Sequence, residues 1–161
     1  MLLLSTLALA QTPEPPERTE PDHGMRIFLG GGTAVSSDGG ARGTAELGVQ
    51  RIERTKRLSG AFGLSLQTFD VDGRPLPILD LDAMLRLRPD QDWTLRPFVS
   101  GGVGLSILLI LPMPCITLGL GAELNLGDLN LDLVLQARQI ADIYITQDSI
   151  TTTTLQVGVG F

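Results

Sequence analysis

The stretch that decides the fold is ITLGLGAELNLGDLNLDLVLQAR, residues 116–138. Residues 116–126 carry apolar side chains at even positions, and residues 129–138 carry Leu or Ala at every odd position. Because side chains alternate between the two faces of a β-strand, each half predicts a strand with one apolar face. Gly127 and Asp128 between them predict a tight turn, so the whole stretch predicts a β-hairpin.

The same period of two recurs along the rest of the chain. It is clearest in LDLDAMLRLR, residues 79–88, and no segment shows a sustained helical period. The weaker alternating segments are residues 25–35, 42–52, 58–69, 95–107 and the C-terminal TTTTLQVGVGF. Together these segments predict eight strands, each of about ten residues or a little more, which is enough to cross a hydrocarbon layer when tilted.

Composition limits the function classes. The chain has 161 residues, which is enough for one domain with a core, and its 19 Gly and 10 Pro favour strands and turns. The net charge is −6 and no basic stripe is visible, so a nucleic-acid partner is not expected. The single cysteine, Cys115, cannot form a disulfide within the chain.

The N-terminal residues differ from the rest of the chain. Residues 1–10, MLLLSTLALA, resemble the apolar core and small-residue cleavage site of a secretory signal peptide; the alternative is a buried N-terminal strand. The basic residues that usually begin such a signal are missing, so we expect the natural start to lie upstream. Residues 11–24 are rich in Pro and Glu and predict an extended, disordered linker. The predicted barrel domain is residues 25–161.

Glycines and charges indicate which face of the strands is inside. Ten glycines fall on the polar face and four on the apolar face, and glycine suits the crowded interior of a narrow barrel. The polar face also holds six Arg and five acidic residues, a near balance that buried charges require. This balance predicts ion pairs across the lumen among Asp80, Asp82, Arg86, Arg88, Glu123, Asp132 and Arg138. The alternative is that the polar face is an ordinary solvated surface.

The ending LQVGVGF resembles the C-terminal strand of bacterial outer-membrane β-barrels, in which a terminal Phe follows alternating apolar residues. Residues 96–106, RPFVSGGVGLS, are also similar to strands of small OmpA-like and OmpX-like barrels. The resemblance implies an all-β, eight-stranded, antiparallel up-and-down transmembrane barrel in the outer membrane, monomeric and surrounded by lipid. It also implies that the barrel-assembly machinery reads the terminal residues Leu155, Val157, Val159 and Phe161.

The sequence predicts a protein without enzymatic activity, with no catalytic, cofactor-binding or metal-binding residues. Some eight-stranded barrels use His with Ser and an acid to modify lipids, but the one histidine here, His23, lies in the predicted linker. One His and one Cys cannot build a metal site. The expected function is structural, or that of a narrow channel. A soluble lipocalin-like barrel that binds a small apolar ligand remains the alternative.

Residues 108–115, LLILPMPC, form the one apolar connection between predicted strands. We expect Leu108 and Ile110 to fold back over the lumen as a lid, with Pro112 and Pro114 stiffening a tip at Met113. The alternative is a hydrophobic mouth through which small apolar molecules enter, as is thought of OmpW-like barrels.

Overall fold

The structure, a computed structural model, describes residues 23–37, 40–53, 57–71, 74–89, 93–126, 129–141 and 149–161. The predicted signal peptide and residues 11–22 of the predicted linker lie outside these ranges. In the described part of the chain, no helix is long and apolar enough to span a membrane. The elements are β1 (His23–Ser36), β2 (Ala41–Glu53), β3 (Leu58–Val71), β4 (Arg74–Leu87), β5 (Leu95–Leu108), β6 (Leu111–Asn125), β7 (Asn130–Ala141) and β8 (Ser149–Gly160).

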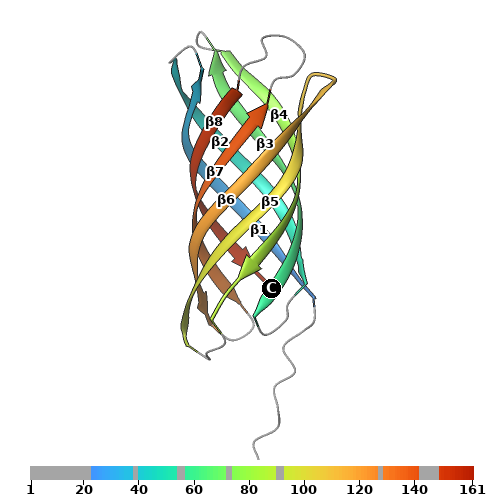
Figure 1. Cartoon of the computed structure of the whole chain (residues 1–161). Helices are drawn as coiled ribbons and strands as arrows, with labels where there is room; N and C mark the ends of the chain where they lie inside the picture. Colours follow the sequence, from blue (N-terminus) through green and yellow to red (C-terminus); the bar gives the residue numbers. More distant parts are fainter. Residues whose placement is uncertain are drawn as a thin grey trace, which may run out of the picture.

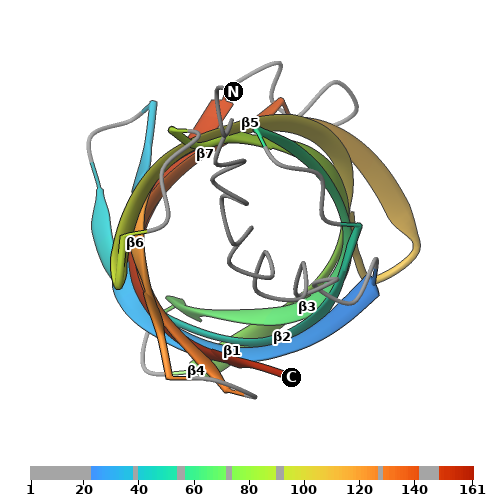
Figure 2. The ribbon, with the colours of Figure 1, turned by 90° about the horizontal axis from the view of Figure 1, so that it is seen from below.

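Each strand pairs antiparallel with its neighbours in the sequence, and β1 also pairs with β8, which closes the barrel (Figure 1). Seen along its axis, the wall is a ring of strands (Figure 2). The predicted up-and-down barrel is therefore confirmed. We call the end where β1 begins and β8 finishes the terminal end, and the opposite end the distal end.

The register of the strands fixes their tilt. Successive Cα partners that start at Arg26 return to β1 at Ser36, ten residues farther along the same strand. For eight strands this offset corresponds to a tilt of about 40° from the barrel axis. The partners in order are Arg26, Gln50, Gly63, Asp82, Gly104, Cys115, Ile140, Ile150 and Ser36.

The strands are somewhat longer than the alternation predicted, and three of the added segments change a prediction made from the sequence. β1 begins at His23, so His23 and Gly24 belong to the barrel wall and not to the linker. β4 begins at Arg74 and β6 at Leu111, although both starts contain prolines. Proline lacks the N–H group that a ladder needs, so it is tolerated where a strand has a free edge. The first residues of β6 have such an edge, since the β6–β7 pairing begins only at Cys115.

Residues 108–115 were expected to form a loop that covers the lumen as a lid, and this expectation is wrong, because most of them belong to β5 and β6. β5 runs to Leu108, and only Leu109 and Ile110 form the turn to β6. Leu109 adopts a positive φ of 59°. The favoured two-residue hairpin turns need a positive φ at this position, which is usually occupied by glycine. Because residues 112–114 pair with β5, Met113 lies inside the wall of the barrel and not at the tip.

The outward surface of the barrel is apolar and the interior is polar. Along β6, Leu118 is 63% exposed whereas its neighbour Thr117 is fully buried, and the same alternation holds along β7. A soluble lipocalin-like barrel would have the reverse distribution, so that alternative is wrong. Leucine, valine and isoleucine dominate the outward face, which is the surface that hydrocarbon accommodates.

The outward face is uneven at the distal end. On β4, β5 and β6 it stays apolar up to the turns, whereas on the other strands it becomes mostly polar or small. The apolar side carries Pro75, Pro77, Ile107, Pro112 and Pro114. The polar side carries Thr33, Gly43, Thr68, Gln139, Thr151 and Thr153.

Apolar side chains also fill the distal part of the interior. We call this group the distal cluster: Ala34, Phe69, Ile78, Met113, Cys115 and Ile140, with Leu108 and Ile150 packed against it. Its buried members come from five strands around the ring, so the cluster extends across the barrel. A smaller group of Ile52, Ala61 and Met84 lines the wall of β2, β3 and β4 nearer the terminal end.

Candidate functional site

Between the distal cluster and the terminal end, the interior holds two groups of paired charges. The first, which we call the distal network, centres on Arg138 of β7. Its guanidinium forms ion pairs of 2.5 Å with both Asp80 and Asp82 of β4 and one of 3.5 Å with Glu46 of β2. All four residues are buried, because the alternation of each strand turns them inward. Uncharged side chains donate further hydrogen bonds to these carboxylates.

Those uncharged partners differ between the carboxylates. Ser106 donates a hydrogen bond of 2.5 Å to Asp80, and Ser65 and Gln156 donate hydrogen bonds of 2.9 and 2.8 Å to Glu46. Asp82 receives, besides Arg138, a weak contact of 3.8 Å from the thiol of Cys115. Asp82 therefore depends most on the arginine for its stabilisation.

The second group, the terminal network, joins Arg26 of β1 and Arg86 of β4 to Asp132 of β7. Arg26 Nε lies 2.7 Å from Asp132 Oδ2, and Arg86 Nη1 lies 3.5 Å from the same oxygen. Both arginines also donate hydrogen bonds of 3.0 Å to Gln50 Oε1. One carboxylate and one amide thus hold two buried guanidinium groups close together.

Each arginine of the terminal network stacks on a phenylalanine ring, and each ring lies against a glycine of the next strand. Arg26 lies 4.6 Å above the ring of Phe28, and Arg86 lies 4.7 Å above that of Phe98. A Cβ atom at Gly48 would lie 2.5 Å from Phe28, and one at Gly121 would lie 2.6 Å from Phe98. These two glycines therefore make the space in which the rings lie flat against the wall.

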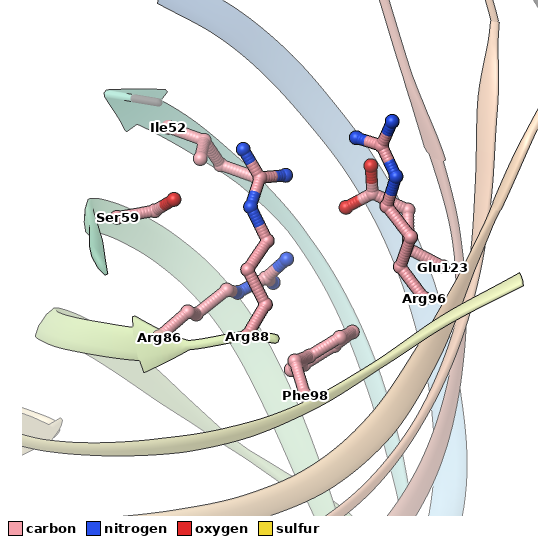
Figure 3. Close-up of a pocket in the computed structure, with 7 residues that line it drawn as sticks. All are labelled: Ile52, Ser59, Arg86, Arg88, Arg96, Phe98 and Glu123. Atoms are coloured by element: carbon pink, nitrogen blue, oxygen red, sulfur yellow. The ribbon is translucent and has the colours of Figure 1, made fainter. Parts of the chain in front are cut away.

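A small cavity, which we call the mouth pocket, opens at the terminal end. Figure 3 shows Arg86 of β4 and Arg88, which follows the end of β4, reaching into it, with Arg96 and Glu123 side by side across from them and Phe98 below. Ile52 and Ser59 complete the lining. Its volume of about 10 Å³ is close to the room that a single water molecule needs.

The structure divides the predicted interior residues into three sets. Arg138 lies with Asp80 and Asp82, and Arg86 lies with Asp132, whereas Arg88 and Glu123 line the mouth pocket. Arg26 and Glu46 also take part in the two networks, as partners of Asp132 and Arg138. The sequence placed both on the polar face but did not identify their partners, because the pairing depends on the register of the strands around the ring, which alternation does not reveal.

The predicted assembly residues and the predicted lid occupy different surroundings. Leu155, Val157, Val159 and Phe161 all point outward, and the Phe161 backbone exchanges two hydrogen bonds of 2.9 Å with Met25. Leu108 and Met113 belong to the distal cluster. Ile110 is 86% exposed at the tip of its turn, so the expectation that it folds over the lumen is wrong.

Within the described ranges, no group of His, Cys, Asp and Glu side chains could hold a metal ion. His23 contributes its backbone to β1, and its side chain lies outside what the structure describes. The hydroxyl of Ser106 lies in the interior and donates a hydrogen bond to the carboxylate of Asp80. The interior side chains thus form ion pairs and the hydrogen bonds that support them.

No protein-family model and no curated protein matches the sequence. Solved structures do match. Neisserial surface protein A has a TM-score of 0.70 at 12% identity, over 87% of this chain and 97% of that one. The outer membrane enzyme PagL has a TM-score of 0.67 at 14% identity, over 83% and 97%.

A third match is the N-terminal β-barrel domain of Pseudomonas aeruginosa OprF, with a TM-score of 0.52 at 15% identity, over 86% of this chain and 96% of that one. These proteins are small eight-stranded barrels of the outer membrane. At such low identities the likeness concerns the fold. The chain therefore has the fold of the small eight-stranded outer-membrane β-barrels.

Proposed function

We propose that the chain is a structural, non-conducting barrel of the bacterial outer membrane, without enzymatic activity. The observation that carries this proposal is the filled interior. The distal cluster draws side chains from five strands, and the two networks of ion pairs occupy the space between it and the mouth pocket. Eight strands leave an interior that side chains can fill, so no continuous aqueous path is needed to satisfy the buried charges.

The membrane location rests on the outward surface and on the fold. Strands of 12 to 15 residues, tilted by about 40°, are long enough to cross the apolar band of an outer membrane, which is roughly 25 Å tall. The exposed leucines and valines supply that band. Lipid is the partner implied by this surface, and the barrel-assembly machinery is the partner proposed for the outward-facing C-terminal strand.

The fold alone does not decide about catalysis, since PagL is described as an outer membrane enzyme. The residues favour a barrel without catalysis. A serine nucleophile needs an adjacent base, and the chain has a single histidine, at the very start of β1. Ser106 instead donates its hydroxyl proton to Asp80 at 2.5 Å, as part of the packed network.

Passage of small apolar molecules, the other function considered from the sequence, finds less support in the geometry. Leu109 and Ile110 are exposed at the distal turn, but the route from there into the lumen is occupied by Phe69, Ile78 and Met113. A molecule entering from the distal end would have to displace these buried side chains.

Two measurements test the proposal. The full chain is expressed and fractionated, and membrane extracts are run on a denaturing gel with and without boiling. A folded barrel in the outer-membrane fraction is expected to migrate faster when unboiled, and recovery in the soluble fraction would refute the membrane location.

The purified barrel is then reconstituted in planar bilayers. Wild type is expected to give no stepwise current, whereas the triple variant F69S/I78S/M113S, which removes the core of the distal cluster, is expected to leak more. Gel mobility confirms that the variant is folded. Steady single-channel currents from wild type, with no increase in the variant, would establish a narrow channel in place of a filled barrel.

A further inference from the structure

The wall of the barrel opens between β2 and β3 at the distal end. The Cα partners that join these two strands end at Thr44 and Phe69. Beyond this level β2 pairs with β1 as far as Ala41, and β3 pairs with β4 as far as Val71, so the two strands diverge. Each of them therefore presents a backbone edge that the other strand does not cover, and such an edge offers N–H and C=O groups to a ligand.

A groove of about 340 Å³, which we call the wall groove, occupies this opening. Its volume lies at the lower end of the roughly 300–1,000 Å³ that is usual for small-molecule sites. Residues with outward parity line its rim and residues with inward parity line its floor, so the groove leads from the outer surface into the wall. The rim is formed by Gly43, Ala45, Thr68 and Pro75, and the floor by Gly32, Thr44 and Phe69.

The floor of the wall groove contains a buried hydroxyl without a partner. Thr44 is 8% exposed, and its Oγ1 forms no hydrogen bond within the described part of the chain. A buried polar group of this kind is costly and rare in native structures unless water or a ligand supplies the missing bond. The groove is far larger than one water molecule requires. Thr44 Oγ1 therefore indicates a ligand that forms a hydrogen bond at the floor of the groove.

The lining of the groove selects the chemistry of this ligand. None of the lining residues is charged, so an ion inside the groove would lose water without gaining a counter-charge. A hydrocarbon chain would leave Thr44 Oγ1 unpartnered. Phe69 and Pro75 provide apolar surface, whereas the two threonines and the strand edges provide donors and acceptors. A neutral ring that carries several hydroxyl groups matches both kinds of surface.

We propose that the wall groove binds one sugar ring, which enters from the outer surface at the distal end. In the complex, Thr44 Oγ1 bonds a ring hydroxyl at the floor, the strand edges bond further hydroxyls, and Phe69 contacts the C–H face of the ring. The rim residues Gly43 and Thr68 belong to the polar side of the distal outward face, where hydroxyls outside the groove stay hydrated. This binding role is additional to the structural function proposed above, and it leaves the filled interior intact.

The test is a titration of the refolded full chain with methyl glucoside in a zwitterionic detergent, which contains no sugar. Saturation-transfer NMR and heat of binding both follow the occupied fraction, and wild type is expected to bind saturably. Thr44→Val removes the floor hydroxyl but keeps the shape of the side chain, and it is expected to weaken binding about fivefold, as the loss of one hydrogen bond does. Gly43→Leu fills the entrance, where no atom lies within 4 Å of a Cβ position, and is expected to abolish binding.

A free sugar and the headgroup of a membrane glycolipid offer the same ring, so a second titration uses octyl glucoside in mixed micelles. Gly43→Leu provides the background for simple partition into the micelle. An affinity above that of methyl glucoside, after this background is subtracted, would assign the ligand to a glycolipid whose chain lies along the apolar wall beside Pro75. Equal affinities would assign it to a free saccharide.

Two matched controls lie outside the groove. Gly60→Leu makes the same change at another outward-facing glycine with no atom within 4 Å of a Cβ position, and Thr151→Val removes an exposed hydroxyl from β8. Both are expected to bind methyl glucoside like wild type, and gel mobility without boiling establishes that each variant is folded. The proposal is overturned if wild type shows no saturable response, if Thr44→Val or Gly43→Leu binds as tightly as wild type, or if Gly60→Leu loses as much affinity as Gly43→Leu.

Discussion

Replacing Arg138 with alanine tests whether the interior is dry and packed. The substitution removes the guanidinium that contacts Asp80, Asp82 and Glu46 at 2.5, 2.5 and 3.5 Å. Breaking a buried ion pair while its partner stays charged costs about 3–5 kcal/mol. Asp80 and Glu46 keep other donors, so most of this loss is expected to come from Asp82, which among the described residues retains the thiol contact of Cys115.

The assay is unfolding by urea in detergent, followed by Trp93 fluorescence and by the gel mobility of unboiled samples. Arg138→Ala is expected to lower the free energy of unfolding by about 3–5 kcal/mol, whereas the exposed Arg42→Ala is expected to change it by less than about 1 kcal/mol. Adding Asp82→Asn to Arg138→Ala is expected to recover part of the loss, since the orphaned charge is then gone.

Two outcomes would refute this reasoning. A loss below about 1 kcal/mol for Arg138→Ala would mean that water reaches the distal network and screens its carboxylates. A further loss on adding Asp82→Asn would mean that Asp82 is stabilised by groups other than the arginine. Either result would favour a wet lumen over a filled one.

Three other substitutions test separate features. Gly48→Ala is expected to destabilise the barrel by about 1–3 kcal/mol, because the new Cβ would lie 2.5 Å from Phe28, whereas Gly43→Ala, with no neighbouring atom within 4 Å, is expected to have little effect in the same urea assay. Leu109→Gly is expected to raise the free energy of unfolding by about 1 kcal/mol by relieving the positive φ; a decrease would show that the Leu109 side chain makes a stabilising contact. Deleting Phe161 is expected to reduce the folded barrel in cells far more than the refolding yield in detergent, and equal losses would assign Phe161 to packing alone.

The alternation of side chains was sufficient to predict all eight strands, and the glycines and balanced charges of the polar face indicated that this face is inside. It failed at the starts of β4 and β6, where Pro75, Pro77, Pro112 and Pro114 read as loop residues. Proline is excluded from strands only where its missing N–H would have bonded a neighbour, and alternation does not show which edges are free.

The candidate site was predictable in its composition and not in its pairing. Parity placed Asp80, Asp82 and Arg138 on the polar face, and the glycines and charge balance of that face assigned them to the interior, but strands β4 and β7 are not neighbours in the ring. Their contact depends on the ten-residue offset of the register and on side chains that reach across the lumen. The role of Arg26 was missed for the same reason, since its partner Asp132 is 106 residues away in the chain.

The uneven outward face has a consequence for how the barrel sits in a bilayer. A lipid layer has nearly the same thickness on all sides of so narrow an object, and exposing apolar surface or burying polar surface costs a fraction of a kcal/mol per Å. Leaning the axis lowers the proline-lined wall of β4, β5 and β6 into the hydrocarbon and lifts the threonines of β8 toward the headgroups. Because the uneven face has a fixed position on the barrel, every molecule is expected to lean toward the same side of its wall, the side of β4, β5 and β6.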